Sequence, residues 1–357
     1  MKVSSTSLDN GKLSLVINPK TGNISSLKSL KNGYEYVDSS TGVNSYQYVT
    51  GVYNGKDHPG NPTTVSDVSI RIKEKGPLLI ALLVTSNGQG INKLSREIKL
   101  YQGTSSVELI NIFEKISTRQ KEGIHFGFGF SLPDAKGRID MPWSIVSPNT
   151  DQLEGANKNW FAFQRWVDIS NPKYGVTWSA VQAPLIEWGG LTGNILDGGR
   201  QPWLWQKEIP QSSLIYSWPV NNHWDTNFPL EQGGAIEQRY AFKIHDKYSV
   251  VDADRFGMET QQPLIVVQTK SNLINKPLVR INNERLMIST IKRTTDNKAV
   301  LLRIKSISDR SELVKLDWTS AKPKEVMQCK ADEQVTEPFK NNVKIEPHGM
   351  INLRLVF

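Results

Sequence analysis

Apolar and polar residues alternate with a period of two along most of the chain, and β-branched residues are frequent. In a strand, successive side chains point to opposite faces, so this pattern indicates strands with one buried face. Turn signals such as Asp9-Asn10-Gly11 separate the runs, and no helical periodicity lasts for three turns. The sequence therefore predicts an all-β protein. The clearest predicted strands are KLSLVIN (12–18), VSDVSIRI (65–72), LLIALLVTS (78–86), KLSREIKLY (93–101), SSVELINIF (105–113) and IHFGFGF (124–130).

The long strands and hairpins in the first part predict a large antiparallel supersandwich. Near Pro263 the composition changes: aromatic residues become rare, and lysine and arginine become more frequent. We therefore expect two domains, a supersandwich over residues 1–262 and a smaller β-sandwich over 263–357. No internal repeat typical of a propeller or solenoid is visible.

The formal net charge of +8 raises the question of nucleic-acid binding. The excess is concentrated from residue 264 onward, with 17 Lys and Arg against 10 Asp and Glu. Those basic residues alternate with apolar ones, as in ISTIKR and VLLRIKS, without interleaved aromatic residues for base stacking. This pattern favours a solvated sheet face, and we expect no nucleic-acid partner.

Cysteine and leader signals add little. A single cysteine, Cys329, excludes an internal disulfide, and the first residues lack the apolar core of a signal peptide. No apolar run reaches the ~18 residues of a spanning helix. We expect a soluble protein without a membrane partner. Its compartment stays open, and a longer parent enzyme with its own signal would be periplasmic or secreted.

Tryptophan is the most informative residue type, because nine of the ten lie between Trp143 and Trp224. A tryptophan presents a flat apolar face, on which the C–H face of a sugar ring stacks. Any single one is more simply explained as core, but for the whole cluster we expect at least one sugar-facing aromatic. Two nearby stretches supply polar partners, and their candidate substrate-binding residues are Arg165, Asp168, Asn221, Asn222, His223, Trp224 and Asp225. A turn in which the asparagines satisfy the backbone explains the second stretch equally well.

Catalytic signatures are weak. The five histidines are scattered without metal-ligand spacing, and no nucleophile elbow, phosphate loop or dinucleotide motif occurs. Glu187, Glu231, Asp168 and Asp225 are candidate carboxylates of a glycosidase pair, which need only be close in space. Each is better explained as structural or substrate-positioning. We therefore assign no catalytic residue and no metal ligand in this chain.

Several segments together resemble the C-terminal region of glycoside hydrolase family 38, the α-mannosidases. SWPVNNHWDTNFPLEQGGAIEQRYAFKIH (217–245) is similar to an Asn- and aromatic-rich stretch followed by Thr-Asn-Phe, Gln-x-Gly and an Arg-Tyr strand. The opening LSLVINPKTGNISSLKS (13–29) is similar to the beginning of that region. WFAFQRWVDIS (160–170), GVTWSAVQAPLIEWGG (175–190) and the tail also resemble its segments, so the resemblance covers most of the chain.

This resemblance implies a galactose-mutarotase-like supersandwich followed by a smaller β-sandwich, both packed against an N-terminal α/β barrel. In the family the nucleophilic aspartate and the zinc ion belong to that barrel, and no matching motif occurs here. The chain is then a non-catalytic part of a mannoside-hydrolysing enzyme, with the barrel and the carbohydrate as partners and no cofactor of its own. Residues 221–225 are expected to reach the substrate site.

Two alternatives from other classes stay open. A stand-alone sugar mutarotase or epimerase needs an acid and a base flanking the sugar ring, for which His125 or His223 are candidates. However, the sequence shows no paired constellation, and the second sandwich has no explanation. A carbohydrate-binding protein would keep the aromatic cluster and bind glycans without a partner chain.

Overall fold

The computed structural model describes residues 1–51, 61–193, 203, 205–223, 229, 231–269 and 276–357. Strands dominate these residues, which confirms the predicted all-β class. Their contacts divide the chain into two compact units, Met1–Tyr248 with Phe256–Pro263, and Ser249–Arg255 with Leu264–Phe357. The predicted domain boundary after residue 262 stays a prediction, because a contact-defined unit need not be an independently folding domain.

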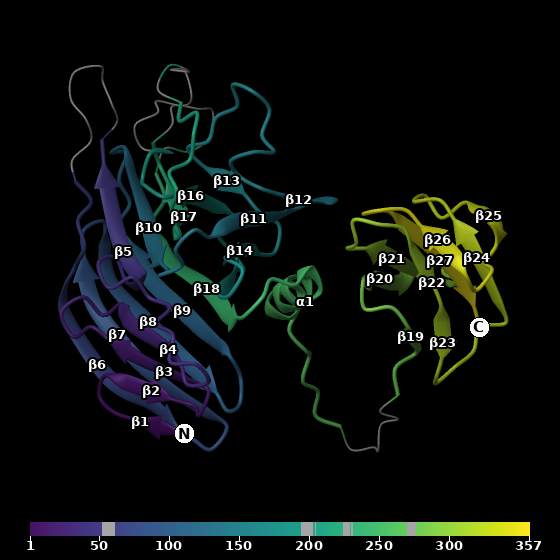
Figure 1. Ribbon diagram of the computed structural model, residues 1–357, viewed down its shortest axis with the longest axis horizontal. Coiled ribbons are helices and arrows are strands. Elements are labelled where there is room, and N and C mark those ends of the chain that lie inside the picture. Colours follow the sequence, from purple (N-terminus) through teal and green to yellow (C-terminus); the bar gives the residue numbers. More distant parts are fainter. Residues whose placement is uncertain (52–60, 194–202, 204, 224–228, 230, 270–275) are drawn as a thin grey trace. The chain divides into compact units, whose positions relative to one another are not determined.

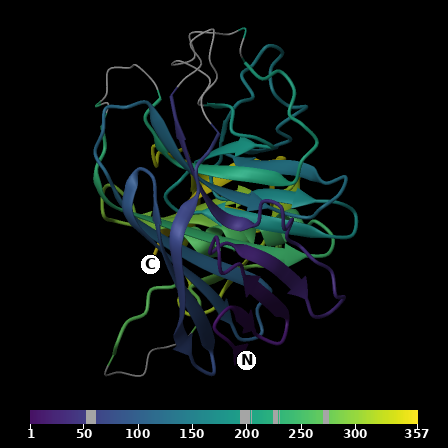
Figure 2. The same cartoon turned by 90° about the vertical axis from the view of Figure 1, so that its left-hand side faces the viewer.

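The first unit contains two nine-stranded antiparallel sheets, visible as stacked layers in Figures 1 and 2. The first sheet has the strand order β1 (Lys2–Val3), β2 (Ser7–Asp9), β3 (Leu13–Ile17), β4 (Ile24–Ser29), β5 (Val43–Thr50), β10 (Glu122–Gly129), β17 (Leu214–Asn221), β16 (Leu185–Trp188) and β13 (Phe161–Ala162). The second has the order β12 (Ser144–Val146), β11 (Lys136–Met141), β14 (Val167–Ser170), β15 (Gly175–Ala180), β18 (Gly234–His245), β9 (Ser106–Lys115), β8 (Ile91–Tyr101), β7 (Leu79–Gly88) and β6 (Val65–Lys75).

Aromatic side chains from both sheets form the core between them. Phe128 of the first sheet packs edge-on against Trp178 and Tyr240 of the second, with ring centroids 5.1 and 5.2 Å apart. Phe126 packs against Phe113 at 6.0 Å. All five rings are buried. Each such aromatic pair adds roughly 0.5–1.5 kcal/mol of stability beyond the contribution from burying its apolar surface. The predicted supersandwich is therefore confirmed.

The second unit contains a five-stranded antiparallel sheet and two short pairs of strands. The large sheet has the order β20 (Leu286–Arg293), β21 (Val300–Ser306), β27 (Met350–Val356), β24 (Glu325–Cys329) and β25 (Val335–Pro338). The pairs are β19 (Val279–Ile281) with β23 (Leu316–Trp318), and β22 (Glu312–Val314) with β26 (Val343–Ile345). In β21, Leu302 and Ile304 are buried while Arg303 and Lys305 are partly exposed, which is the predicted solvated basic face.

The sequence reading missed a helix, α1 (Val250–Gln261). Its start is marked by Ser249, whose hydroxyl accepts the Asp252 backbone N–H at 3.2 Å, and Pro263 follows its end. These are ordinary capping and stop signals. The helix lacks a strong apolar stripe, so periodicity gave no indication of it. Gly257 lets it approach the sandwich closely, because a Cβ there would lie 2.8 Å from Trp166.

Candidate functional site

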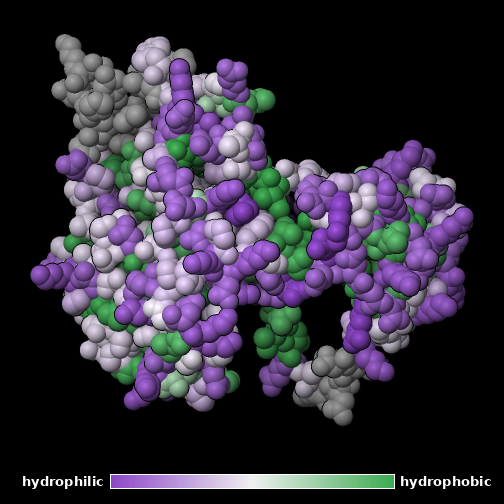
Figure 3. Space-filling view, viewed as in Figure 1, coloured by the Kyte–Doolittle hydropathy of each residue, from purple (hydrophilic) through white to green (hydrophobic). Residues whose placement is uncertain are grey.

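The tryptophan-rich segment divides into core and surface residues. Trp166, Trp178, Trp188 and Trp218 are buried, as the core interpretation predicts. Trp143 and Trp203 are exposed to 51% and 73%. Trp224 lies outside the described residues, so its role in stacking stays a prediction. Polar residues on the viewed face far outnumber apolar ones, which occur singly or in small groups (Figure 3).

Buried polar residues gather on the outer face of the first sheet, opposite the core. The Nε2 atom of His125, on β10, lies 2.7 Å from Oε1 of Glu187, on β16. Both side chains are fully buried. The His125 ring also stacks on Trp218 of β17, with ring centroids 5.1 Å apart. We call these residues, together with His223, the buried histidine cluster.

Glu187 is held in place by hydrogen bonds to both of its carboxyl oxygens. Its second oxygen, Oε2, accepts the backbone N–H groups of Thr192 and Gly193, at 2.5 and 2.6 Å. A carboxylate has only acceptors, so Glu187 fixes the proton of His125 on Nε2. The Nδ1 atom of His125 has no hydrogen-bond partner among the described residues. The carboxylate thus orients the imidazole and anchors the turn after β16.

His223 follows β17 and is fully buried beside this pair. Burial is the main cause that lowers its pKa to about 3, and the neighbouring His125 and Lys121 contribute to this lowering. The backbone of Gly51 lies close enough to raise the pKa of His223 slightly. However, neither nitrogen of the His223 ring forms a hydrogen bond of normal geometry with a described residue. Uncharged imidazole is therefore the stable form in the fold at neutral pH.

Chain segments converge around this cluster and are tied together by polar contacts. Lys121 donates from Nζ to the His223 carbonyl at 2.8 Å, and the Gly51 N–H donates to the Lys121 carbonyl at 2.9 Å. The Asn222 amide donates to the Thr118 and Gln120 carbonyls at 3.2 and 3.0 Å. The ends of the described chain at residues 51, 193 and 223 are therefore anchored next to one another.

A buried ion pair supports the same end of the sandwich. Lys115, at the end of β9, pairs with Glu122, at the start of β10, and both side chains are almost fully buried. Glu122 also accepts the Tyr48 hydroxyl at 2.6 Å. Removing one partner of such a pair leaves an uncompensated charge in the interior, so the pair fixes this end of the unit.

The structure places the predicted substrate-binding residues in two regions. Asn221 ends β17 and Asn222 follows it; Asn222 is buried, and its amide NH₂ donates to two backbone carbonyls. Asn221 accepts the His223 backbone N–H at 3.2 Å through Oδ1. Asp225, like Trp224, falls outside the described residues. Substrate binding by these residues stays a prediction.

Arg165 and Asp168 belong to the second sheet and its preceding turn. Arg165 donates from Nε to Asp140 at 2.9 Å. Asp168 is fully buried, and its carboxylate accepts hydrogen bonds from Thr177, Ser170 and His245 at 2.9, 2.6 and 2.8 Å. These contacts are structural, and a role of either residue in binding substrate stays a prediction.

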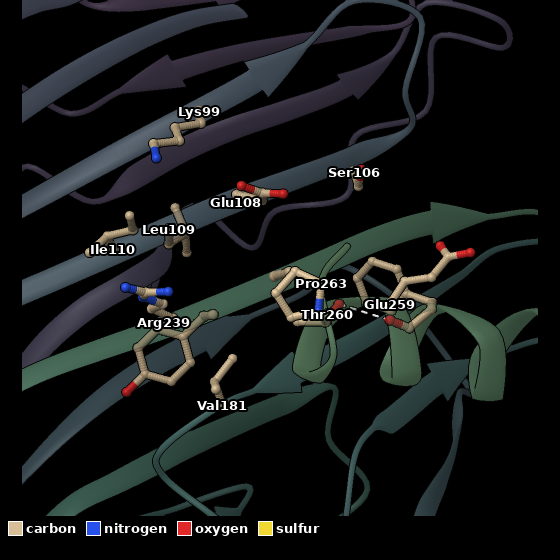
Figure 4. Close-up of a pocket in the computed structure, with 13 residues that line it drawn as sticks. Lys99, Ser106, Glu108, Leu109, Ile110, Val181, Arg239, Glu259, Thr260 and Pro263 are labelled. Carbon is tan, nitrogen blue, oxygen red and sulfur yellow. Dashed lines mark hydrogen bonds between the residues drawn. The ribbon is translucent and has the colours of Figure 1, made fainter. Parts of the chain in front are cut away.

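A groove of about 320 Å³ lies on the outer face of the second sheet, beside α1 (Figure 4). Ile110, Val181 and Pro263 contribute apolar lining, and charged groups of both signs surround them. Lys99 stands directly opposite Glu108 on the neighbouring strand. Opposite charges at this spacing compensate each other, so the groove offers no net charge for an ionic ligand.

No group of three or more His, Cys, Asp or Glu side chains in the described ranges has an arrangement that would hold a metal ion. No helix in those ranges is long and apolar enough to cross a membrane. His125 and Glu187 were separate candidates in the sequence, and their pairing was missed because they are 62 positions apart in the chain. Lys115, Glu122 and Trp218 were not singled out at all.

Comparison with known proteins agrees with this architecture. Residues 8–180 match the family described as the glycosyl hydrolases family 38 C-terminal domain. The chain is similar to an α-mannosidase from Enterococcus faecalis V583, with 10% identity and a TM-score of 0.72, covering 98% of this chain and 42% of that one. It is also similar to a glycosyl hydrolase family 38 protein from Enterococcus faecalis, with 10% identity and a TM-score of 0.71, covering 98% and 44%.

The chain thus spans less than half the length of these two structures. A galactose 1-epimerase from Lactobacillus acidophilus NCFM matches over 68% of this chain and 94% of its own, with 11% identity and a TM-score of 0.42. No curated protein sequence matches. The resemblance noted in the sequence is confirmed: residues 8–180 of this chain match the glycosyl hydrolases family 38 C-terminal domain, and the fold of the chain matches the corresponding part of the two Enterococcus faecalis structures.

Proposed function

We propose that the chain is the C-terminal, non-catalytic and carbohydrate-facing part of an α-mannosidase-like glycoside hydrolase. The main support is the match of 98% of this chain to structures of which it covers only 42% and 44%. The remaining part of such an enzyme would be an N-terminal barrel that performs the hydrolysis of the mannoside. The zinc ion that the family resemblance implies would belong to that barrel.

The role proposed for this chain is to shape and support the substrate site. The buried histidine cluster, with Lys121 and Asn222, anchors the described segment ends at 51, 193 and 223. Residues held by buried hydrogen bonds lose less conformational entropy when a ligand binds, so their contribution to affinity is larger. The candidate residues 221–225 begin at this anchor, which supports their assignment to the sugar-facing end.

The test compares the chain alone with the chain together with the proposed barrel. With 4-nitrophenyl α-D-mannopyranoside, we expect no turnover by the purified chain. We expect turnover when the barrel encoded upstream in the same reading frame is present. In that assembly, Asn221→Ala should raise KM with little change in kcat. Zinc-independent turnover by the chain alone, or a reading frame without a barrel, would contradict the proposal.

The buried histidine cluster favours one alternative, a sugar mutarotase or epimerase. Glu187 orients His125 with Nδ1 free to exchange a proton, which is the arrangement of a general base with its positioning carboxylate. Against it, both side chains are fully buried, and a Cβ at Gly123 would already lie 2.9 Å from the His223 ring. Polarimetry of freshly dissolved α-D-glucose and α-D-galactose tests it. Interconversion that is equally slow with wild type, His125→Ala and no protein removes this alternative.

A further inference from the structure

A small cavity in the first unit lies between the start of β11, the segment after β12 and the segment before β17. Its volume is about 280 Å³, at the lower end of the range for small-molecule sites. Trp188 and two prolines, Pro148 and Pro210, supply its apolar lining. A ligand the size of one six-membered ring matches this space. None of the residues predicted from sequence to bind substrate lines it.

The polar groups of this cavity are fixed and complementary. Asn149 accepts the Ile209 backbone N–H at 3.3 Å through Oδ1, so its amide NH₂ is left as a donor. Gln211 donates from Nε2 to the Ala135 carbonyl at 3.0 Å, so its Oε1 is left as an acceptor. In each amide the backbone partner determines which atom is free. One preset donor and one preset acceptor therefore line the same cavity.

The floor is rigid. Trp188 is 4% exposed and donates from Nε1 to the Ser212 carbonyl at 3.0 Å. Its ring packs on Gly137, where a Cβ would lie 2.5 Å from Trp188. The Ser212 hydroxyl accepts the Leu214 N–H at 3.0 Å and keeps its own proton for another acceptor. Little of this site has to be reorganised when a ligand enters, which reduces the cost of binding.

The chemistry of the lining selects the ligand class. Lys136 is the one charged residue among the described residues that line the cavity, and the other polar groups are amides and hydroxyls. Neighbouring hydroxyl groups of a sugar both donate and accept, so a vicinal diol satisfies a free amide donor and a free amide acceptor together. An anion would use the donors and leave the Gln211 oxygen unpaired at a cost. From this we infer that the cavity around Asn149, Trp188 and Gln211 binds a neutral monosaccharide unit.

This inference does not depend on the proposed function, because the cavity is built entirely from this chain and needs no catalytic barrel. It assigns a sugar-binding subsite that is separate from the 221–225 segment. If the hydrolase proposal fails, the sugar-binding subsite is unaffected. If the subsite fails, the result of the mannoside assay is unaffected. A carbohydrate enzyme with such a subsite would hold a branch or a neighbouring unit of its glycan.

The experiment titrates the purified chain with methyl α-D-mannopyranoside, methyl α-D-glucopyranoside and methyl α-D-galactopyranoside up to 100 mM. The readouts are calorimetry and the indole N–H resonances of ¹⁵N-tryptophan-labelled protein, with Trp188 assigned by Trp188→Phe. We expect saturable binding of at least one glycoside, with a shift of the Trp188 resonance. Inorganic phosphate should leave that resonance unchanged.

Two variants remove one free group each while keeping most of the surroundings. Asn149→Asp keeps the acceptor for the Ile209 N–H and loses the donor, and Gln211→Ala loses the acceptor. Each should weaken binding about fivefold, the value of one neutral hydrogen bond. Gln182→Ala is the matched control. The Gln182 side chain does not line the cavity, and it accepts the Arg239 backbone N–H with a distance of 2.8 Å. The assignment is overturned if no glycoside shifts the Trp188 resonance, if phosphate does so instead, or if the variants bind like the control.

Discussion

The buried and uncharged His223 makes a quantitative prediction about acid stability. Its pKa is about 3 in the fold and 6.5 in the unfolded chain. Between these values the unfolded state binds more protons, so stability falls as the pH drops below about 6.5 and is fully present above it. Between pH 7.5 and pH 5.0, this single group should destabilise the first unit by about 2 kcal/mol.

The perturbation is His223→Leu, which keeps a similar volume and removes the titrating group. Because the ring nitrogens have no described hydrogen-bond partner, the loss of the imidazole should cost little at pH 7.5. We expect the difference in unfolding free energy between pH 7.5 and pH 5.0 to shrink by about 2 kcal/mol in the variant. The comparison uses two pH values within each protein, so a constant packing penalty cancels.

The assay is urea unfolding followed by intrinsic fluorescence. Nine of the ten tryptophans lie between residues 143 and 224, so the signal reports mainly on the first unit. His348→Asn, in the second unit, serves as the control and should keep the wild-type pH dependence. If His223→Leu and wild type lose the same stability between the two pH values, His223 is not buried in its neutral form and the reasoning fails.

Three further predictions concern packing and reactivity. Lys115→Met should cost about 3–5 kcal/mol in urea unfolding, since a buried carboxylate loses its partner, and a loss below 1 kcal/mol would show that water reaches the pair. Gly175→Ala should cost about 1–3 kcal/mol of unfolding free energy, because its Cβ would lie 2.5 Å from Ser170. The control Gly190→Ala has no close contact around its Cβ and should be nearly neutral. Equal thermal unfolding midpoints for the two variants would contradict this. Burial raises the pKa of the Cys329 thiol, so iodoacetamide should react slowly until urea unfolds the second unit. Fast alkylation without urea would refute that.

Period-two alternation correctly placed most of the core because a strand permits only two directions for a side chain. In β8 the alternation also assigns Arg96 to the same face as Leu94 and Ile98, and Arg96 is fully buried there. Its guanidinium donates to the Asn44 and Thr21 carbonyls at 3.2 and 2.8 Å, and burial lowers its pKa to about 9. Composition alone would have put an arginine outside, so the periodicity was the better guide to its direction. Its partners come from a distant strand, β5, and from the turn at Thr21, and they have no signal in the local sequence.

The buried histidine cluster shows why a site on a sheet is harder to predict than the sheet itself. His125 and Glu187 meet across β17, so their pairing depends on the register of two ladders. Gly127 on β10 stands opposite Tyr216 on β17, and Tyr216 stands opposite Glu187 on β16. His125 and Gly127 are two residues apart on β10 and therefore share a face of the sheet. Glu187 thus lies on the same face as His125.

The β10–β17 ladder also contains an irregularity between Ile124 and Phe126, next to His125 itself. A shift of one residue would turn the imidazole toward the opposite face of the sheet and separate it from the carboxylate. Alternation in the sequence fixes which residues share a face within one strand, but not how neighbouring strands align. The alternation in IHFGFGF therefore predicted a strand correctly, and only the assembled sheet could show which carboxylate its histidine would meet.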